Sequence, residues 1–275
     1  MKQLLYALTF LAHLISLSTL AQTSVMSFNL RFNNPKDNEN SWENRKEEVL
    51  DMLRYYSPEI IGIQEGLENQ VSYIDSTLQD YNYVGVGRED ARTRGEYAAI
   101  FYKTNRLKLL ESKTYWLSEK PEEVSVGWDA AMERIVTFSK FKDLKNLDTL
   151  YVFNAHYDHV GKIARVESSK LILKIIHDRR LLNEKIIVMG DLNSEQGDEP
   201  IKLLKQTLED SYENKNTKTY GPLGTYNAFN RDLIMQRRID YIFTKNINVI
   251  EYIHIDDKRK NNLFLSDHLP VLLKF

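Results

Sequence analysis

Short apolar runs rich in β-branched residues recur along the chain, and most of them end at a glycine, a proline or a polar residue. This pattern is typical of buried β-strands. It predicts strands over residues 23–29, 59–64, 83–87, 97–102, 107–110, 114–117, 135–141, 150–155, 186–189, 225–227, 238–243, 249–255 and 271–275. Apolar residues at helical spacing predict helices after Ser41 and over residues 67–78, 163–182 and 199–208. Many strands with so few helices favour two packed sheets flanked by helices over one doubly wound sheet.

Acidic, amide and imidazole residues stand at the ends of five separate predicted strands or inside a short one. They are Asn29, Glu65, His156, Asp191, Asn193, Asp240, Asp267 and His268. Turn chemistry does not predict such residues on so many strands. Because side chains at the strand ends of one sandwich can converge on a single mouth, the sequence predicts one polar site there.

Asp191 and Asn193 follow the apolar run at 186–189 with one residue between them. If the chain is still extended there, both side chains point to the same side. Phosphoester hydrolysis has a use for this pair, because a carboxylate orients or deprotonates a water and an amide donates to a phosphate oxygen. The same residue types also form ordinary polar turns, so this motif alone leaves both interpretations open.

The amino terminus differs from the rest of the chain. A short basic start, Met1-Lys2-Gln3, is followed by the mostly apolar residues 4–20 and by Ala21 at a suitable cleavage position. We therefore expect a signal peptide over residues 1–21 and export to the periplasm or beyond. A membrane anchor is disfavoured because the run is short and interrupted by polar residues, so no membrane span is expected in the mature chain. The absence of cysteine excludes lipidation at a cysteine and disulfide bonds.

The composition is that of an ordinary globular protein, with 42% hydrophobic and 28% charged residues. No linker or low-complexity tract divides it, so we expect one domain over residues 22–275. Loss of Lys2 with the signal peptide changes the formal net charge from −2 to −3. Proteins that grip long nucleic acids usually carry a basic excess, so positive charge must be local or the substrate small. The arginines of residues 88–96 have acidic neighbours, which favours a solvated loop.

Six stretches, in order along the chain, resemble the metal-dependent endonuclease/exonuclease/phosphatase superfamily, which includes deoxyribonucleases, deadenylases, inositol-polyphosphate phosphatases and secreted sphingomyelinases. They are Ser27-Phe-Asn-Leu-Arg31, Ile61-Gly-Ile-Gln-Glu65, Asn154-Ala-His156, Gly190-Asp-Leu-Asn-Ser194, Arg238-Ile-Asp-Tyr241 and Ser266-Asp-His-Leu-Pro270. Residues 95–100, 115–118, 128–131 and 156–159 are similar to an exported bacterial subgroup. The resemblance implies an α/β fold of the deoxyribonuclease-like type, a four-layered sandwich of two packed mixed β-sheets flanked by helices, with the catalytic domain over residues 22–275.

The resemblance also implies a hydrolase that depends on Mg²⁺ or Mn²⁺ and directs a water in line at phosphorus. Glu65 is then the primary metal ligand, assisted by Asn29 directly or through water. Asp267 lies beside the metal or a second metal. A hard cation of this kind takes few carboxylates and keeps several waters.

The remaining implied roles concern the substrate phosphate. Asp191 holds the attacking water, Asn193 contacts the scissile phosphate and His156 donates to a phosphoryl oxygen. Asp240 orients His268, and either Asp191 or this pair is the general base. Weaker substrate-binding candidates are Arg31, Asp158, His159 and Arg165.

Two kinds of substrate stay open. The resemblance to nucleases favours a nucleic-acid phosphodiester, whereas the missing basic excess favours a small sugar-, inositol- or lipid-linked phosphoester. No stable protein partner is expected. The dinuclear metallophosphatases are excluded because their Asp-x-His and Gly-Asn-His patterns are absent from the sequence. A catalytically silent binding module on the same scaffold is the alternative of another class, and the complete set of metal and base residues disfavours it.

Overall fold

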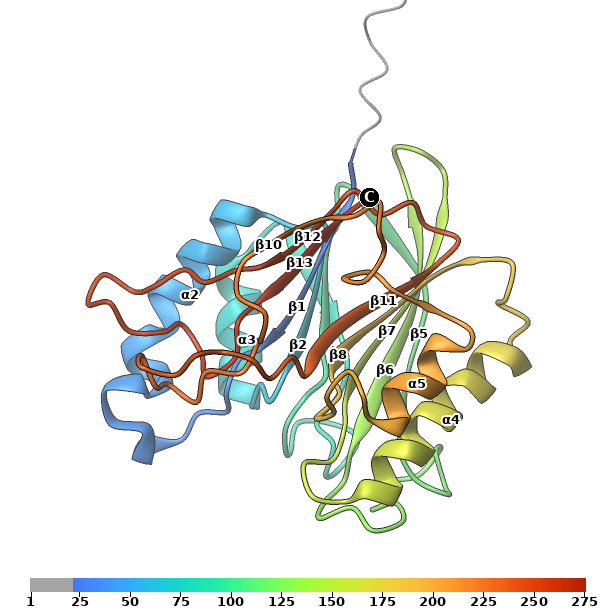
Figure 1. Cartoon of the computed structure of the whole chain (residues 1–275), viewed down its shortest axis with the longest axis horizontal. Helices are drawn as coiled ribbons and strands as arrows, with labels where there is room; N and C mark the ends of the chain where they lie inside the picture. Colours follow the sequence, from blue (N-terminus) through green and yellow to red (C-terminus); the bar gives the residue numbers. More distant parts are fainter. Residues whose placement is uncertain (1–21) are drawn as a thin grey trace, which may run out of the picture.

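The structure, a computed structural model, describes residues 22–275, and the predicted signal peptide over residues 1–21 lies outside these described residues. Two β-sheets pack face to face, and helices cover the outer side of each sheet (Figure 1). The predicted four-layered α/β sandwich is therefore confirmed. No helix within residues 22–275 combines the length and the apolar character that a membrane crossing requires.

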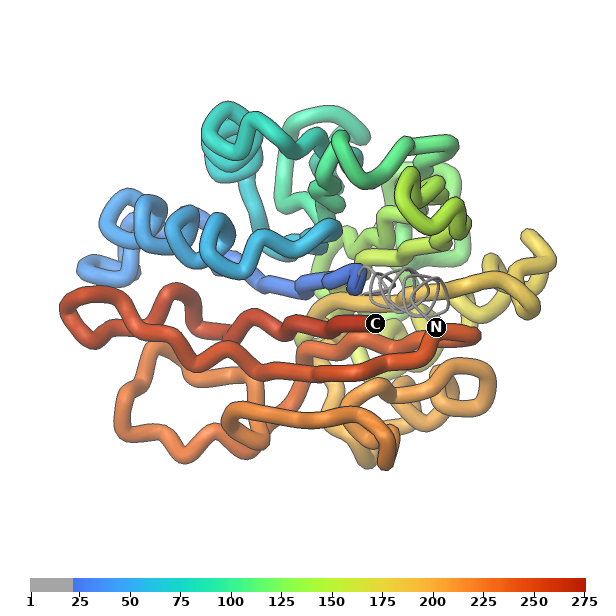
Figure 2. Tube along the Cα trace, turned by 90° about the horizontal axis from the view of Figure 1, so that it is seen from above, coloured from blue at the N-terminus to red at the C-terminus, as the bar shows by residue number. Residues whose placement is uncertain are grey.

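The first sheet is built around β1 (Ser24–Asn29), which runs parallel to β2 (Ile60–Gln64) and antiparallel to β13 (Val271–Lys274). Its outer strands are β12 (Glu251–His254), β10 (Lys218–Tyr220), β4 (Ile100–Lys103) and β3 (Tyr81–Val84). Thr23 and Phe275 exchange two backbone hydrogen bonds of 2.9 and 3.0 Å. The first and last strands of the described chain therefore lie side by side, as the blue and red tubes of Figure 2 show.

The second sheet has β7 (Thr149–His156) and β8 (Lys185–Asp191) as parallel neighbours at its centre. Its other strands are β5 (Leu107–Trp116), β6 (Ile135–Asp143), β11 (Asp240–Lys245) and β9 (Glu209–Asp210), each antiparallel to its neighbours. Because β7 and β8 are parallel and in register, His156 and Asp191 are neighbours at the same edge of the sheet.

Four α-helices in the described chain complete the outer layers. They are α2 (Trp42–Tyr56) and α3 (Glu68–Thr77) on the first sheet, and α4 (Lys162–Asp178) and α5 (Glu199–Lys205) on the second (Figure 1). Each turns an apolar stripe toward its sheet, as Val49 and Leu53 of α2 do. The core therefore consists of three apolar layers: one under each pair of helices and one between the two sheets.

At one end of the space between the sheets, the inward-facing strand positions change from apolar to polar residues. Met189 of β8 belongs to the inner layer, and the next residue on that face is Asp191. By the same alternation, His156 of β7, Asn29 of β1 and Asp240 of β11 are on the inner side, each two or four residues from an apolar inner residue of its strand. The space between the sheets thus changes from apolar packing to a group of acids, amides and imidazoles within a few residues.

The secondary structure differs from the sequence prediction in a few places. Residues 107–110 and 114–117, predicted as two strands, belong to the single strand β5, in which a register shift between Leu109 and Glu111 marks a β-bulge. The strand predicted over residues 225–227 is an isolated bridge between Tyr226 and His268. Strands β9 and β10 escape prediction because they are very short and lack an apolar run. The polar loop before Ser41 contains the 3₁₀-helix η1 (Pro35–Asn40).

Candidate active site

Residues at or just beyond the ends of β1, β2, β7 and β8 line one cavity of about 530 Å³. Its lining includes the predicted residues Arg31, Glu65, His156, His159, Asp191, Asn193, Asp267 and His268. Asn29 and Asp240 lie behind this lining and are hydrogen-bonded to it. The structure therefore brings most of the predicted residues to one place, in a cavity of the size that binds small molecules.

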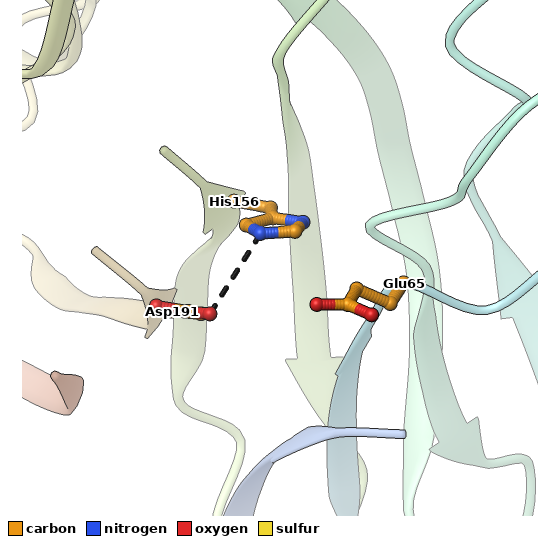
Figure 3. A group of neighbouring side chains, drawn as sticks. All are labelled: Glu65, His156 and Asp191. Atoms are coloured by element: carbon orange, nitrogen blue, oxygen red, sulfur yellow. Dashed lines mark ion pairs between the residues drawn. The ribbon is translucent and has the colours of Figure 1, made fainter. Parts of the chain in front are cut away.

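Glu65, His156 and Asp191 all line this cavity, and their side chains lie close together (Figure 3). One oxygen or nitrogen atom of each lies within 4.8 Å of the others, and His156 Nε2 is 3.7 Å from Asp191 Oδ2. Asn29 Nδ2 donates to Glu65 Oε1 and to Asp191 Oδ2, both at 3.0 Å. Since Asn29 Oδ1 accepts the backbone N–H of Arg31, Asn29 positions the two carboxylates in this arrangement.

Three residues of the lining have left-handed backbones: Arg31 (φ 58°), Glu65 (φ 61°) and Asn193 (φ 45°). Residues other than glycine adopt this conformation rarely, and such strain concentrates at functional sites. Glu65 follows Gln64, which faces the other sheet, so a continued strand would direct Glu65 away from the cavity. The left-handed turn ends the alternation and brings the carboxylate inside.

The chain does not stay extended from Asp191 to Asn193, although both residues line the cavity. The chain turns, and the backbone N–H of Asn193 donates to Asp191 Oδ1 at 2.9 Å. Asn193 Nδ2 donates to the backbone oxygen of Tyr157 at 3.0 Å. The turn therefore fixes the Asp191 carboxylate from its own backbone.

The group of Glu65, His156 and Asp191 fits a divalent cation. Burial raises the pKa of Asp191 to about 7 and also raises the pKa of Asp267 and of Glu96. These carboxylates share one cavity, so their charged forms are costly there. A cation next to Glu65 and Asp191 would offset that cost, and carboxylate oxygens are the ligands that Mg²⁺ prefers. The donor set therefore agrees with the metal predicted from the sequence.

Asp240 and His268 form a hydrogen-bonded pair beside Asp191. His268 Nδ1 is 2.8 Å from Asp240 Oδ2, which also accepts the hydroxyl of Thr225 at 2.6 Å. His268 Nε2 is 3.8 Å from Asp191 Oδ2. Burial by itself lowers the pKa of His268, but the charges of Asp240 and Asp191 outweigh it and hold the pKa well above its ordinary value. The predicted pairing is thus present, and His268 is an imidazolium at neutral pH.

Arg88, Glu96 and Arg134 also line the cavity, although the sequence did not mark them as site residues. Arg88 donates to both oxygens of Glu96, at 2.7 and 3.1 Å, and is only 7% exposed. The expectation of a solvated loop is therefore wrong for Arg88, because Glu96 neutralises its charge and allows its burial. Burial lowers the pKa of His156 well below its ordinary value, and the charges of Arg134 and Arg88 lower it further. His156 is consequently neutral.

The position of Arg134 explains why sequence reasoning missed it. The predicted site residues were mostly polar residues at the carboxyl ends of strands, whereas Arg134 immediately precedes β6. Because β6 is antiparallel to β7, its amino end reaches the same mouth as the carboxyl end of β7. A search for polar residues before antiparallel strands, the place that Asp240 has at the start of β11, would have found it.

Two predicted substrate-binding residues, Asp158 and Arg165, lie outside the cavity lining. Asp158 is 1% exposed, and its Oδ2 accepts Arg134 Nε at 3.2 Å. Its Oδ1 accepts the backbone N–H groups of Val160 and Gly161 at 2.9 and 2.7 Å. Arg165 Nη1 donates to the backbone oxygen of Asp158 at 3.0 Å. Asp158 therefore braces Arg134, and Arg165 supports the turn that carries Asp158.

Arg31 and Asp267 lie on the first-sheet side of the cavity. Arg31 donates through Nε and Nη2 to Asp37 at 2.9 and 3.1 Å, and this contact raises the pKa of Arg31. Its Nε is 3.9 Å from Asp267 Oδ2. Asp267, predicted beside the metal, thus faces a guanidinium and is not part of the group formed by Glu65, His156 and Asp191.

Comparisons with known proteins agree with this geometry. The model of the Endonuclease/Exonuclease/phosphatase family matches residues 26–268. The fold is similar to that of a Bacteroides thetaiotaomicron protein of this family, with a TM-score of 0.87 and 33% identity over 92% of this chain and 97% of that one. A mannosyl-6-phosphatase of the same organism has a TM-score of 0.86 and 34% identity, over 91% and 98% of the two chains. An uncharacterized protein of Acanthamoeba polyphaga mimivirus is 26% identical over 85% of this chain and 92% of its own length. This chain belongs to the endonuclease/exonuclease/phosphatase family.

Proposed function

We propose that this chain is an exported phosphomonoester hydrolase that depends on Mg²⁺ or Mn²⁺ and acts on a small, sugar-like phosphorylated molecule. The observation that carries the proposal is the single cavity in which Glu65, His156 and Asp191 lie next to the Asp240–His268 pair. The first group suits a divalent cation, and the second supplies an imidazolium that can donate a hydrogen bond to a phosphoryl oxygen. The amino-terminal pattern of residues 1–21 supports export.

The size and the charge of the site support a small substrate. A cavity of about 530 Å³ is in the range of small-molecule sites. The sequence has a formal net charge of −2 and lacks the basic excess of proteins that bind long nucleic acids. The similarity to a mannosyl-6-phosphatase, at 34% identity, points in the same direction. Together they favour a sugar phosphate over the nucleic-acid phosphodiester that the sequence left open.

The charge states of the side chains suggest their roles. Asp191, with a pKa raised by burial to about 7, is suited to accept the proton of the attacking water. The bond from the water oxygen to phosphorus forms as the bond to the ester oxygen breaks. The leaving oxygen takes a proton from a second water, and the resulting hydroxide takes up the proton that Asp191 accepted. His268 and His156 donate N–H groups to phosphoryl oxygens as negative charge builds. A divalent metal held at Glu65 would polarise one of these oxygens.

A substrate panel tests the proposal on the mature chain, residues 22–275, in Mg²⁺ and in Mn²⁺. The panel contains mannose 6-phosphate and other sugar phosphates, inositol phosphates, sphingomyelin, single-stranded DNA, RNA and supercoiled DNA. We expect phosphate release from sugar phosphates, loss of this activity with a chelator, and recovery on addition of metal. Cleavage of nucleic acid without any phosphate release from a monoester would overturn the proposal in favour of a nuclease. Inactivity on every substrate would favour the silent binding module.

Glu65→Gln tests the metal site separately, because it keeps the shape of the side chain and removes its charge. We expect Mn²⁺ affinity, measured by calorimetric titration, to fall about tenfold or more in a site with so few carboxylates. Glu209→Gln, an exposed position on the edge strand β9, is the matched control. Wild-type affinity in Glu65→Gln would remove Glu65 from the metal site.

Export has its own test in cell fractionation followed by sequencing of the amino terminus. We expect the mature chain outside the cytoplasm, beginning at Gln22. A full-length chain that starts at Met1 and stays in the cytoplasm contradicts export, and it leaves the chemistry of the site untouched.

A further inference from the structure

Arg134 forms part of the cavity wall beside His156, and the roles proposed above do not use it. It is 4% exposed and lines the cavity together with His156 and His159. Two of its nitrogens have defined partners: Nε donates to Asp158 Oδ2 at 3.2 Å, and Nη2 is 2.8 Å from His159 Nδ1. These contacts hold the guanidinium in one orientation.

The third nitrogen of Arg134, Nη1, has only the two ring nitrogens of His156 within hydrogen-bond distance among residues 22–275. It lies 3.2 Å from Nδ1 and 3.0 Å from Nε2 of His156. The two ring nitrogens of an imidazole point away from each other, so Nη1 lies against the ring and does not donate along either lone pair. Oε2 of the Glu96 carboxylate is 4.0 Å from Nη1. Nη1 therefore keeps hydrogen-bonding capacity inside the cavity.

Both carboxylates near Arg134 are committed to other partners as well. Glu96 accepts two hydrogen bonds from Arg88, at 2.7 and 3.1 Å. Asp158 Oδ1 accepts the backbone N–H groups of Val160 and Gly161. Neither carboxylate is free to move onto Nη1, so an anionic ligand in the cavity is the natural acceptor for this donor.

We propose, on the basis of the phosphoester hydrolysis proposed above, that Arg134 binds a terminal oxygen of the substrate phosphoryl group and makes the site selective for monoesters over diesters. A phosphomonoester has three terminal oxygens and nearly two negative charges at neutral pH. A diester has two terminal oxygens and one charge. In this arrangement, terminal oxygens on the Asp191 side are bound by the metal held at Glu65 and by the imidazolium of His268. Arg134 donates to the third terminal oxygen, beside His156. In a diester, the second ester group occupies that position and leaves Nη1 without its acceptor.

Asp158 is a positioning residue in this scheme. It touches Arg134 through Nε and is tied to the chain by two backbone N–H groups, so it fixes where Nη1 lies. A lysine at position 134 could keep the positive charge, but it has no planar fork that bonds Asp158 and the phosphate at once.

Calorimetric titration of the Mg²⁺-loaded mature chain with inorganic phosphate and with dimethyl phosphate tests the inference without relying on turnover. For Arg134→Met we expect affinity for inorganic phosphate to fall about ten- to a hundredfold, the size of a lost charge-assisted hydrogen bond. Affinity for dimethyl phosphate should change less than about threefold, because it lacks the third terminal oxygen. An equal loss for both probes, or no loss for inorganic phosphate, would overturn the inference.

Arg106→Met is the matched control, since it also breaks an arginine–aspartate pair, in which the aspartate is buried and the arginine partly buried. Arg106 Nη2 lies 2.9 Å from Asp143 Oδ2, at the far end of β6 from Arg134. We expect comparable loss of stability and unchanged phosphate affinity. If Arg134→Met does not fold, Arg134→Lys decides: phosphate affinity should fall about three- to tenfold, and unchanged affinity contradicts the inference.

The same experiment separates this inference from the proposed function. A wild-type chain that hydrolyses no phosphomonoester in the substrate panel defeats the proposed function, and the phosphate titration still decides the role of Arg134. A wild-type chain that hydrolyses monoesters, with an Arg134→Met variant of unchanged preference between the two probes, defeats only the role of Arg134.

Discussion

Asp191 lies between two imidazoles that carry different charges. Its Oδ2 is 3.7 Å from His156 Nε2 and 3.8 Å from His268 Nε2. Burial lowers the pKa of His156, and the neighbouring arginines lower it further. For His268, burial also lowers the pKa, but the charges of Asp240 and Asp191 outweigh burial and raise the pKa. Different surroundings therefore give the two imidazoles different charges: His156 is a neutral hydrogen-bond donor and His268 a cationic one.

The first residue-scale prediction concerns the Asp240–His268 pair. His268→Ala should lower kcat about 10²- to 10⁴-fold and leave metal affinity nearly unchanged, because a positioned acid–base group is lost. Asp240→Asn keeps the shape and should lower kcat in the same direction, since the imidazole loses its charged partner. Because the two residues act as one unit, the double variant should be little worse than the worse single variant. Fully additive losses in this cycle would show that the pair is not coupled.

The second residue-scale feature is His254 on β12, which is 1% exposed. Its Nδ1 donates to the backbone oxygen of Pro222 at 2.6 Å, while its Nε2 has no partner among the described residues. Burial lowers the pKa of His254 to about 4, and the charge of Arg238 lowers it further against the opposing effects of Pro222 and Asp240. The folded protein therefore holds this histidine neutral.

This neutrality predicts a loss of stability in acid. As pH falls from about 6.5 to about 4, the unfolded chain binds a proton at His254 that the folded chain does not, so the free energy of unfolding decreases by up to about 3 kcal/mol. His254→Gln should reduce this slope in urea unfolding at pH 7, 5.5 and 4.5. Part of the slope should remain in this variant, because His156 is also buried and neutral. His177→Gln on the exposed side of α4 is the control, and a slope unchanged by His254→Gln would contradict the assignment.

At the scale of elements, the site depends on how closely β7 and β8 approach. Gly190 pairs with Ala155 and has a φ of +142°. A Cβ atom at this position would lie 1.9 Å from the backbone oxygen of Ala155. Only glycine therefore allows β8 to turn there and place Asp191 beside His156.

Gly190→Ala should lower the free energy of unfolding by at least about 2 kcal/mol, from backbone strain and from the clash with β7. It should also weaken Mn²⁺ binding, because it moves Asp191. Gly197→Ala is the control, since a Cβ atom there meets nothing within 4 Å. Equal chemical-denaturation midpoints for the two variants would show that β8 tolerates a side chain at position 190.

At the scale of the whole molecule, Asn154 ties the two sheets together. It lies on β7, and its Nδ2 donates to the backbone oxygens of Ile63 and Ala99 on the first-sheet side at 2.8 and 2.9 Å. Its Oδ1 accepts Gln64 Nε2 at 2.6 Å. Gly62 leaves the room for this amide, since a Cβ atom there would lie 2.8 Å from Asn154 Cγ. The sheets thus share a polar link between their apolar contact and the cavity.

Asn154→Asp should lower the free energy of unfolding by at least about 2 kcal/mol, because it removes a donor from two buried carbonyls and buries a carboxyl group. Of these two carbonyls, that of Ala99 keeps a backbone donor, the N–H of Ile63. Asn246→Asp is the matched control, since Asn246 Nδ2 also donates to two backbone oxygens, those of Leu182 and Glu184, but at an exposed position. Water can replace the exposed contacts, so the control should change stability by less than about 1 kcal/mol. If thermal unfolding showed similar decreases in the free energy of unfolding for both variants, Asn154 would not stabilise the contact between the sheets.

The sequence by itself determined the layers of the fold and the centre of the site. The alternation of buried and exposed positions can be recognised from neighbouring residues, because successive residues of a strand point to opposite faces of the sheet. The ordered polar residues at strand ends, among them Glu65, His156 and Asp191, were recognisable for the same reason. The exact limits of the strands were harder to predict from the sequence. A bulge keeps β5 continuous, and the short strands β9 and β10 have no apolar run.

Only the tertiary structure decided which further side chains complete the cavity. Arg134 reaches it because β6 is antiparallel to β7, and Arg88 is buried there because Glu96 neutralises its charge. The left-handed backbone at Glu65 turns its carboxylate inward against the strand alternation. Strand pairing and charge compensation join residues that are far apart along the chain or follow a turn. Since no local pattern records such contacts, their effect on the site became visible only in the folded molecule.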